Sequence, residues 1–181
     1  DGTALGIGWD LQDDTFRVLS RTKELQGPLT KRKLLSLLMS VFDPLGWISP
    51  FFLPMKLIMQ QASKVEPVMS WDDPLPDELV RRWEEWLQSA EKDLNRIRVP
   101  RLTAAEDADE NLEEIHVFTD ASETGLGAVA YRVTRASQDS ERTVSCLIGK
   151  VKVAPSKVIS MPRLELMAAE LGLKVAHEVW R

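Results

Sequence analysis

The chain has 181 residues, of which 44% are hydrophobic and 28% are charged, and its formal net charge is -5. This length is enough for one ordinary domain or for pieces of two or three, and the acidic balance gives no global signature of a nucleic-acid binder. A single cysteine, Cys146, excludes an internal disulfide and a cysteine-based metal site, and it suits a reducing, intracellular setting. The two histidines, His116 and His177, lie far apart in the sequence, which argues against a zinc site.

Neither a membrane span nor a signal peptide is visible in the sequence, so we expect no membrane partner. The chain opens with "DGTALGIGWD", without a methionine, and stops at "HEVWR" inside a helical pattern, so we expect a piece of a longer protein. Charge is local: "TKRK" (residues 30–33) is basic, whereas "EDADENLEE" (residues 106–114) is acidic and typical of a solvated linker.

The first predicted elements are two short strands in residues 3–20, "TALGIGWDLQDDTFRVLS", around the turn "DLQDDT". The pair Asp13-Asp14 resembles the Tyr-x-Asp-Asp of reverse transcriptases, but Leu11 occupies the tyrosine position. We therefore interpret the two aspartates as turn residues.

A helical hairpin is predicted next. Thr30 can cap a helix from Lys31 to about Phe42, which Pro44 and Gly46 then stop. A second helix is expected from about Pro50 through "FFLPMKLIMQQASK". We expect Trp47 and Phe51 to pack in the interior of this hairpin, with base stacking as the less favoured alternative.

A long amphipathic helix follows in residues 77–97, "DELVRRWEEWLQSAEKDLNRI", after the break "WDDPLP". Its apolar residues recur on one face: Leu79, Trp83, Trp86, Ala90, Leu94 and Ile97. A tryptophan stripe can stack on bases, but this spacing favours a core face. Val99-Pro100 is expected to end the element.

The hydrophobic period then changes to two. Three strands are predicted, "IHVFTD", "GLGAVAYRV" and "RTVSCLIGKVKV", followed by a helix from about Pro162. The predicted fold class is therefore α+β: an opening β-hairpin and a mainly helical region, then an α/β unit made of a three-stranded antiparallel meander and one helix.

Two acids in this second unit are candidate metal ligands. Asp120 ends the first strand, on the face of His116 and Phe118, and Glu165 lies in the first turn of the helix. The small residues Ala169, Gly172 and Ala176 follow Glu165 at helical spacing and would permit close approach, beside an apolar face of Leu164, Ala168, Leu171, Val175 and Val179. If the acids meet at one sheet edge, they suit a hard cation such as Mg²⁺. The alternatives are a turn residue and a complement to the helix dipole.

The motifs around these acids resemble a known family. "VFTDAS", the glycine-rich second strand and "PRLELMAAELG" are similar to the first half of a ribonuclease H domain, and "MPRLELMAA" resembles its retroelement versions. "LGIGWD", the stretch from "TKRK" to "LIMQ" and the tryptophan-rich helix resemble the polymerase tail of BEL/Pao-type retrotransposon polyproteins. Of these, "FDPLGWISP" is the most specific stretch.

The resemblance implies a catalytic role for both acids. Asp120 corresponds to the first catalytic acid and Glu165 to the second, as ligands of Mg²⁺ or Mn²⁺ in two-metal hydrolysis of the RNA strand of RNA–DNA hybrids. The other ligands of the family come from a later strand and helix, so we expect an incomplete catalytic set and an inactive isolated chain. We interpret Glu123 and Glu170 as surface acids.

The resemblance also implies a division of the chain. Residues 1–29 correspond to the end of a polymerase palm, 30–66 to a thumb-like helical hairpin, 67–112 to a connection helix and linker, and 113–181 to the N-terminal half of a ribonuclease H-like domain. Lys31, Arg32 and Lys33 are candidate phosphate contacts. The implied partners are RNA–DNA hybrid, primer–template nucleic acid and the rest of the Pol polyprotein, in the cytoplasm, the nucleus or a virus-like particle.

Two other functions stay open at this point. One is a non-catalytic nucleic-acid-binding or scaffolding remnant of a decayed or domesticated element. The other is an aspartic peptidase, a label that often accompanies the Pao name. Such peptidases need Asp-Thr-Gly or Asp-Ser-Gly. Here Asp120 is followed by Ala121-Ser122, and Asp1-Gly2-Thr3 has the wrong order.

Overall fold

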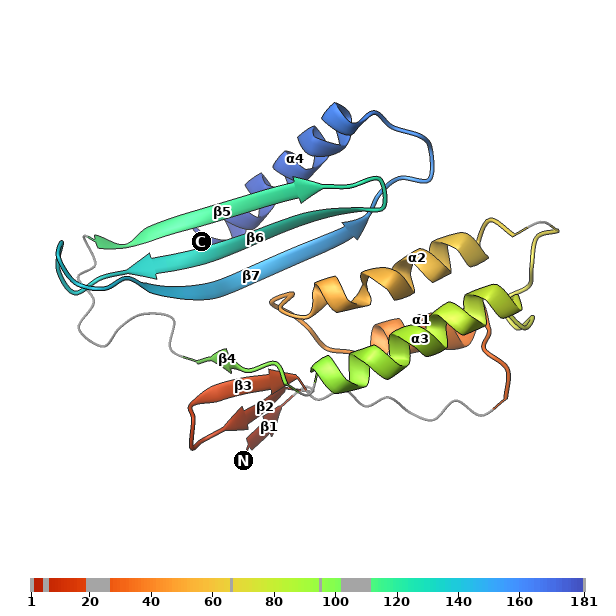
Figure 1. Cartoon of the computed structure of the whole chain (residues 1–181), viewed down its shortest axis with the longest axis horizontal. Coiled ribbons are helices and arrows are strands. Elements are labelled where there is room, and N and C mark those ends of the chain that lie inside the picture. The colour runs from red at the N-terminus through yellow and green to blue at the C-terminus, as the bar shows by residue number, and fades with distance from the viewer. Residues whose placement is uncertain are drawn as a thin grey trace.

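The structure is a computed structural model that describes residues 2–4, 7–18, 27–65, 67–94, 96–101 and 112–180. It contains a four-stranded sheet, a group of helices, and a three-stranded sheet covered by one further helix (Figure 1). The predicted α+β class is confirmed. No helix in the described part of the chain is long and apolar enough to cross a bilayer.

The first sheet is antiparallel in the order β1 (Gly2–Ala4), β2 (Ile7–Asp10), β3 (Thr15–Val18) and β4 (Val99–Pro100). The predicted hairpin is β2–β3, and Asp14 in its turn has a positive φ of 48°. The carboxylate of Asp14 accepts hydrogen bonds from Trp9 Nε1 at 2.9 Å and from Arg101 Nε at 2.7 Å. This confirms the turn interpretation.

One prediction in this region is wrong in detail. Val99-Pro100 does not simply end the preceding helix; it forms β4, which pairs with Thr15 and Phe16 of β3. A two-residue strand carries no periodicity, so only its distant partner reveals it. The pairing brings the end of the helical region back to the N-terminal hairpin.

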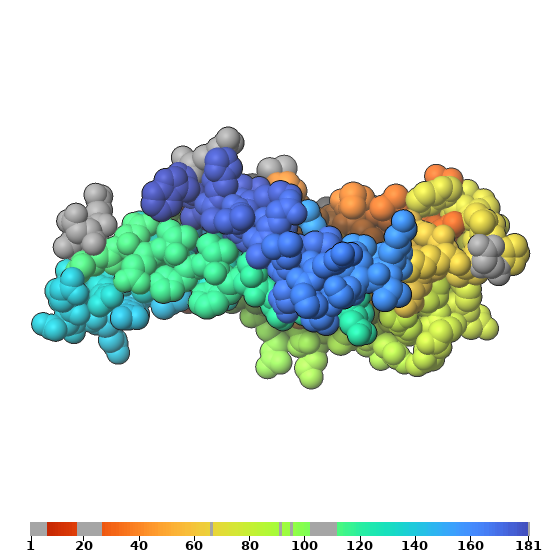
Figure 2. All heavy atoms as spheres, turned by 90° about the horizontal axis from the view of Figure 1, so that it is seen from above, coloured from red at the N-terminus to blue at the C-terminus, as the bar shows by residue number. Residues whose placement is uncertain are grey.

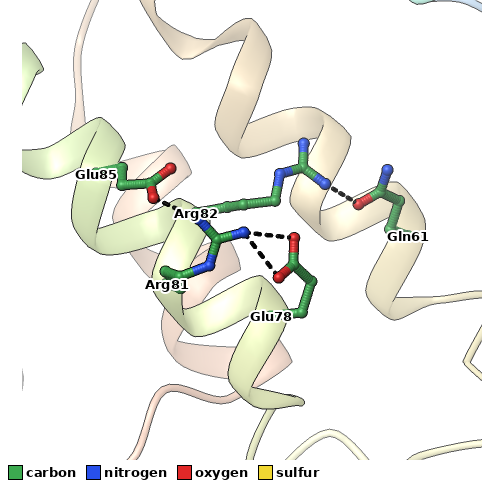
Figure 3. Close-up of polar contacts among 5 residues, drawn as sticks. All are labelled: Gln61, Glu78, Arg81, Arg82 and Glu85. Carbon is green, nitrogen blue, oxygen red and sulfur yellow. Dashed lines mark hydrogen bonds and ion pairs between the residues drawn. The ribbon is translucent and has the colours of Figure 1, made fainter.

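The helical unit contains α1 (Lys31–Ser40), the 3-10 helix η1 (Ser49–Phe52), α2 (Leu53–Ala62) and α3 (Asp77–Leu94). The side chain of Thr30 caps α1 by accepting from Lys33 N, as predicted from the sequence. The second helix of the predicted hairpin starts as η1 and continues as α2. Charged pairs on α3 (Arg81 with Glu78 and Glu85) and a hydrogen bond from Arg82 to Gln61 of α2 lie on the outside (Figure 3).

The predicted apolar face of α3 is a core face. Leu79, Trp83, Trp86, Ala90 and Leu94 are all buried in one cluster with residues of α1, η1 and α2. The rings of Trp83 and Trp86 lie 5.1 Å apart, and Trp86 Nε1 donates to the Phe51 carbonyl at 2.6 Å. These indoles are therefore not available for base stacking.

Trp47 lies elsewhere than predicted. Phe51 packs against the helical core, but Trp47 stacks on Phe16 of β3, with ring centroids 6.0 Å apart, and donates from Nε1 to the Leu147 carbonyl. Leu147 belongs to the second sheet, so Trp47 lies between two strands, β3 and β7, that are far apart in the sequence. Local spacing could not reveal such a contact.

The second sheet is the predicted meander of β5 (Glu114–Ala121), β6 (Gly125–Thr134) and β7 (Thr143–Val153). The helix α4 (Met161–Val179) crosses one face of it (Figure 1). The predicted apolar face of α4 packs on this sheet, with Leu164, Ala168, Leu171 and Val175 buried and Val179 partly buried. Val117 of β5 and Ala128 and Ala130 of β6 face the helix.

The helical unit contacts the second sheet along β7. Leu53 at the start of α2 lies against Gly125, and the loop before η1 reaches Gly149. Figure 2 shows the sheet unit (green to blue) and the helical unit (orange to yellow) as adjoining parts of one surface.

Candidate functional site

Asp120 is exposed at the C-terminal end of β5, where it pairs across the sheet with Gly127. Residue 119 faces α4, since a Cβ built on Gly172 would lie 2.3 Å from Thr119 Cγ2. Because side chains alternate along a strand, Asp120 projects from the opposite face, with His116 and Phe118. The predicted face of Asp120 is thus observed.

The turn after Asp120 is made by another residue. Ser122 Oγ accepts from Gly125 N at 3.0 Å and from Thr124 N at 3.3 Å, and Ser122 N donates to the Gly125 carbonyl at 2.8 Å. The carboxylate of Asp120 makes no hydrogen bond or ion pair with any residue that the structure describes. The turn therefore does not account for an acid at position 120.

Glu165 is exposed and likewise has no described partner. It lies in the second turn of α4, not in the first turn as predicted, because the helix begins at Met161. Gly172 lies over Thr119, and Glu165 is seven residues nearer the helix start, about 10 Å along the axis. Figure 1 shows α4 beginning at the end of the sheet where β5 finishes. Both acids therefore lie at the same end of this unit, but Glu165 comes from the helix-covered side and Asp120 from the other.

The face that bears Asp120 is hollowed. A groove of about 370 Å³ lies between this face and the loop that precedes η1. Its two walls are residues of the sheet and residues of the loop, among them Asp120, Phe118, Tyr131, Gly46, Trp47 and Pro50. Cys146 also lines the groove, and burial raises the pKa of its thiol, so the thiol is neutral near neutral pH.

The residues present do not by themselves hold a divalent metal. In the described ranges there is no group of three or more His, Cys, Asp or Glu side chains placed to bind an ion. Asp120 and Glu165 project from different sides, and the surface acid Glu170 is paired with Lys174. Mg²⁺ requires about six oxygen ligands, so no metal-dependent step can be assigned to this chain alone.

The three basic residues of α1 all have partners within the protein. Lys31 is buried, donates to the Met69 carbonyl and lies 5.7 Å from the ring centroid of Trp71. Arg32 makes two hydrogen bonds to Asp72, at 2.7 and 3.0 Å, and these lower the pKa of that carboxyl. Lys33 Nζ donates to the Pro28 carbonyl at 2.7 Å. The three residues hold neighbouring segments against the start of α1, and their contact with phosphates stays a prediction.

A comparison with protein families decides the relationship of the chain. Residues 30–181 match the profile of the Pao retrotransposon-like RNaseH-like domain. The chain belongs to this family. A search of the curated proteins gave no match.

The match to the Pao RNaseH-like family begins at Thr30, the N-cap of α1, and therefore includes the helical unit as well as the meander. The chain is thus a BEL/Pao-type retrotransposon region, as the stretches around "FDPLGWISP" predicted, and its RNaseH-like character agrees with the motifs around Asp120 and Glu165. Asp1, which was considered in a peptidase motif, lies outside the described residues.

Sequence reasoning missed the loop side of the groove. The sequence predicts that Gly46 ends a helix and that Trp47 packs inside the helical hairpin. In the structure both residues line the groove that Asp120 also lines. The signal was the unusual concentration of proline, glycine and tryptophan in "FDPLGWISP", which marked a special structure without saying what it contacts.

Proposed function

We propose that this chain is part of a retrotransposon Pol polyprotein and contributes to hydrolysis of RNA in RNA–DNA hybrids. Asp120 and Glu165 supply carboxylate oxygens for divalent metal ions, Mg²⁺ or Mn²⁺, which RNase H-like domains generally use. One observation carries the proposal: in a member of an RNaseH-like family, Asp120 presents, at the end of β5, a carboxylate that has no partner among the described residues.

The described residues do not supply a complete catalytic set, and we expect the remaining acids to come from other parts of the polyprotein. We therefore expect the isolated chain to cleave no hybrid, because two carboxylates supply too few oxygen ligands for two ions. Within the complete polyprotein, the same two acids are expected to be essential.

The test is a substitution in the complete polymerase–nuclease protein. Asp120→Asn removes the charge and keeps the shape, and it is expected to reduce hybrid cleavage by about 100-fold or more, as loss of a metal ligand does. Glu165→Gln is expected to do the same. Cleavage of a labelled RNA–DNA hybrid and primer extension are measured on the same preparations, and extension is expected to be unchanged.

Glu123→Gln is the matched control, since Glu123 is an exposed acid in the turn that follows Asp120. It is expected to leave cleavage unchanged. If Asp120→Asn cleaves as fast as Glu123→Gln, Asp120 is not a metal ligand and the proposal fails.

We also propose a polymerase origin for the N-terminal half, with β2–β3 as the last palm hairpin, the α1–η1–α2 segment as a thumb and α3 as a connection. The support for this proposal is the resemblance of "LGIGWD", the stretch from "TKRK" to "LIMQ" and the tryptophan-rich helix to a polymerase tail. In this proposal, primer–template nucleic acid is a partner of the intact protein, inside the cell, and the exposed Arg32 is the basic residue best placed to reach a phosphate.

A second candidate function is non-catalytic binding of nucleic acid. The observation in its favour is that the described residues contain no cluster of three possible metal ligands. If the complete protein binds an RNA–DNA hybrid but substitution of neither acid changes hybrid cleavage, this candidate replaces the first.

A further inference from the structure

We propose that residues 43–50, here called the clamp loop, lock the helical unit onto β7 and so form a permanent wall of the groove that contains Asp120. The inference concerns how this groove is assembled, and it stands whether or not the protein cleaves RNA. It makes the helical unit and the second sheet one folding unit rather than two units on a tether.

Backbone contacts between the clamp loop and β7 are the first argument. Gly149 N donates to the Leu45 carbonyl at 2.7 Å, and Trp47 Nε1 donates to the Leu147 carbonyl at 3.3 Å. Gly46 is buried, has a φ of +68°, and a Cβ built on it would lie 1.7 Å from the Gly149 carbonyl oxygen. No side chain fits at position 46, so the two backbones meet because this residue is glycine; a Cβ built on Gly149 would make a tight contact, 3.0 Å from the Gly46 carbonyl oxygen.

The contacts continue along the same strand. Lys56 Nζ donates to the Val151 carbonyl at 3.4 Å, and Gln60 Nε2 donates to the Ala154 carbonyl at 2.8 Å. β7 is an outer strand of its sheet, whose free edge would otherwise leave peptide groups unpaired. The clamp loop and α2 supply partners for these groups, as an adjoining strand would.

The clamp loop itself is braced from within. Asp43 Oδ2 accepts from Ile48 N at 3.1 Å and from Ser49 Oγ at 3.2 Å. Ile48 is fully buried in the helical core, and Trp47 stacks on Phe16 of the first sheet. A loop held at both ends in this way transmits the position of the helical unit to β7.

The consequence concerns access to Asp120. Trp47 and Pro50 form the side of the groove that faces Phe118 and Asp120. Any ligand that approaches Asp120 from this face must therefore contact the helical unit as well as the sheet.

The test uses amide hydrogen exchange on the complete chain, read at Gly149 N–H, which is bonded to the clamp loop. Gly46→Ala is expected to increase the exchange rate of this amide at least about tenfold, because the added methyl group cannot coexist with the Gly149 carbonyl. Amides of β5 that pair with β6 are expected to change less.

Two controls separate docking from other effects of glycine replacement. Gly27 also has a positive φ, of +70°, but its added Cβ would lie 3.5 Å from the end of the Lys33 side chain, so Gly27→Ala tests backbone strain without the clash. Gly127→Ala adds a methyl group to the sheet where nothing lies within 4 Å. Both are expected to leave the exchange of Gly149 N–H unchanged.

Exchange of Gly149 N–H at the same rate in Gly46→Ala as in the parent overturns the proposal, as does equal acceleration by Gly27→Ala. If Gly46→Ala does not fold, Trp47→Phe is used instead, since it removes the indole N–H bond to Leu147 and part of the indole ring but keeps an aromatic ring against Phe16. Faster exchange at Gly149 in this variant supports the clamp, and an unchanged rate overturns it. None of these measurements depends on nuclease activity, so a failure of the proposed function leaves them interpretable.

Discussion

An acid at the end of a strand can form the turn that follows or present its carboxylate to a ligand. Here these two roles belong to different residues, Ser122 and Asp120. Ser122 makes the turn through its hydroxyl group, and the carboxylate of Asp120 is left without a described partner. A carboxylate with no structural task, exposed at a strand end in an RNaseH-like family, is what the proposed metal-binding role requires. The same holds for Glu165, which lies beyond the first turn of α4, where an acid would complement the helix dipole.

Gly172 sets the distance between α4 and β5. Replacement by alanine places a methyl group 2.3 Å from Thr119 Cγ2, so α4 must move away from β5. We expect Gly172→Ala to lower the free energy of unfolding by about 1–3 kcal/mol, even though alanine favours helix formation. Urea unfolding of the purified chain measures the change.

Thr119→Ser is the matched partner for this test because it removes the clashing methyl group. In a double-mutant cycle, adding Thr119→Ser to Gly172→Ala is expected to recover most of the loss, whereas Thr119→Ser alone has a small effect. A strictly additive cycle would show that the contact between these two residues does not limit the packing of α4.

Polar side chains join the start of α1 and the β2–β3 turn to segments that are distant in the sequence. The segment of residues 69–72 is held at the start of α1 by Lys31 and Arg32, and the β2–β3 turn is held to β4 by the pair Asp14–Arg101. The sequence suggests phosphate binding for Lys31 and Arg32 and a turn for Asp14. In the structure each of these charged side chains joins two elements. The two ion pairs among them, Arg32–Asp72 and Asp14–Arg101, are exposed, so they orient the elements more than they stabilise them.

The Asp14–Arg101 pair predicts a pH dependence of the β3–β4 junction. Hydrogen bonds from Arg101, and more weakly from Trp9, lower the pKa of Asp14 below its ordinary value of 3.8. A lowered carboxyl pKa stabilises the folded state above the ordinary pKa, and this contribution is lost as the pH falls through the folded-state value. In Arg101→Gln we expect the Asp14 pKa to rise toward 3.8, measured by NMR titration of the carboxyl carbon.

The same variant checks the physical cause. The difference in stability between the parent and Arg101→Gln is expected near neutral pH and should vanish once Asp14 is protonated in both. A difference that persists in acid would mean that Arg101 acts by packing on Trp9, whose ring centroid lies 5.5 Å from its guanidinium carbon.

At the scale of the whole molecule, two hydrophobic cores are joined at the edge of β7. One core lies among α1, η1, α2 and α3, and the other lies between α4 and the second sheet. The family match begins at Thr30 and so includes both cores, which agrees with the proposal that they fold together. The groove with Asp120 lies where the two parts meet.

The second unit is expected to be unstable alone. Residues 113–181 expressed without the helical unit lose the contacts of the clamp loop and α2 with β7, and they expose the strand edge and the groove face. We predict a broad or low-temperature unfolding transition for this fragment by circular dichroism, compared with the complete chain. A cooperative melt of the fragment at the temperature of the complete chain would contradict this.

The sequence by itself determined the elements and their types, apart from the short strands β1 and β4. The α3 stripe, the change to period two at residue 115 and the apolar face of α4 all rest on local periodicity, which is a property of neighbouring residues. It also pointed to Asp120 and Glu165 as acids at one end of a sheet, through motifs that resemble the family to which the chain belongs.

Only the tertiary structure decided how these elements meet. Three sets of contacts join residues about 30 to 100 positions apart: the pairing of β3 with β4, the place of Trp47 between Phe16 and Leu147, and the partners of Lys31 and Arg32. No period or spacing encodes such contacts. The groove beside Asp120 has the same origin. Its second wall exists because Gly46 lets its backbone touch that of the distant Gly149, and a sequence shows a glycine without showing what it approaches.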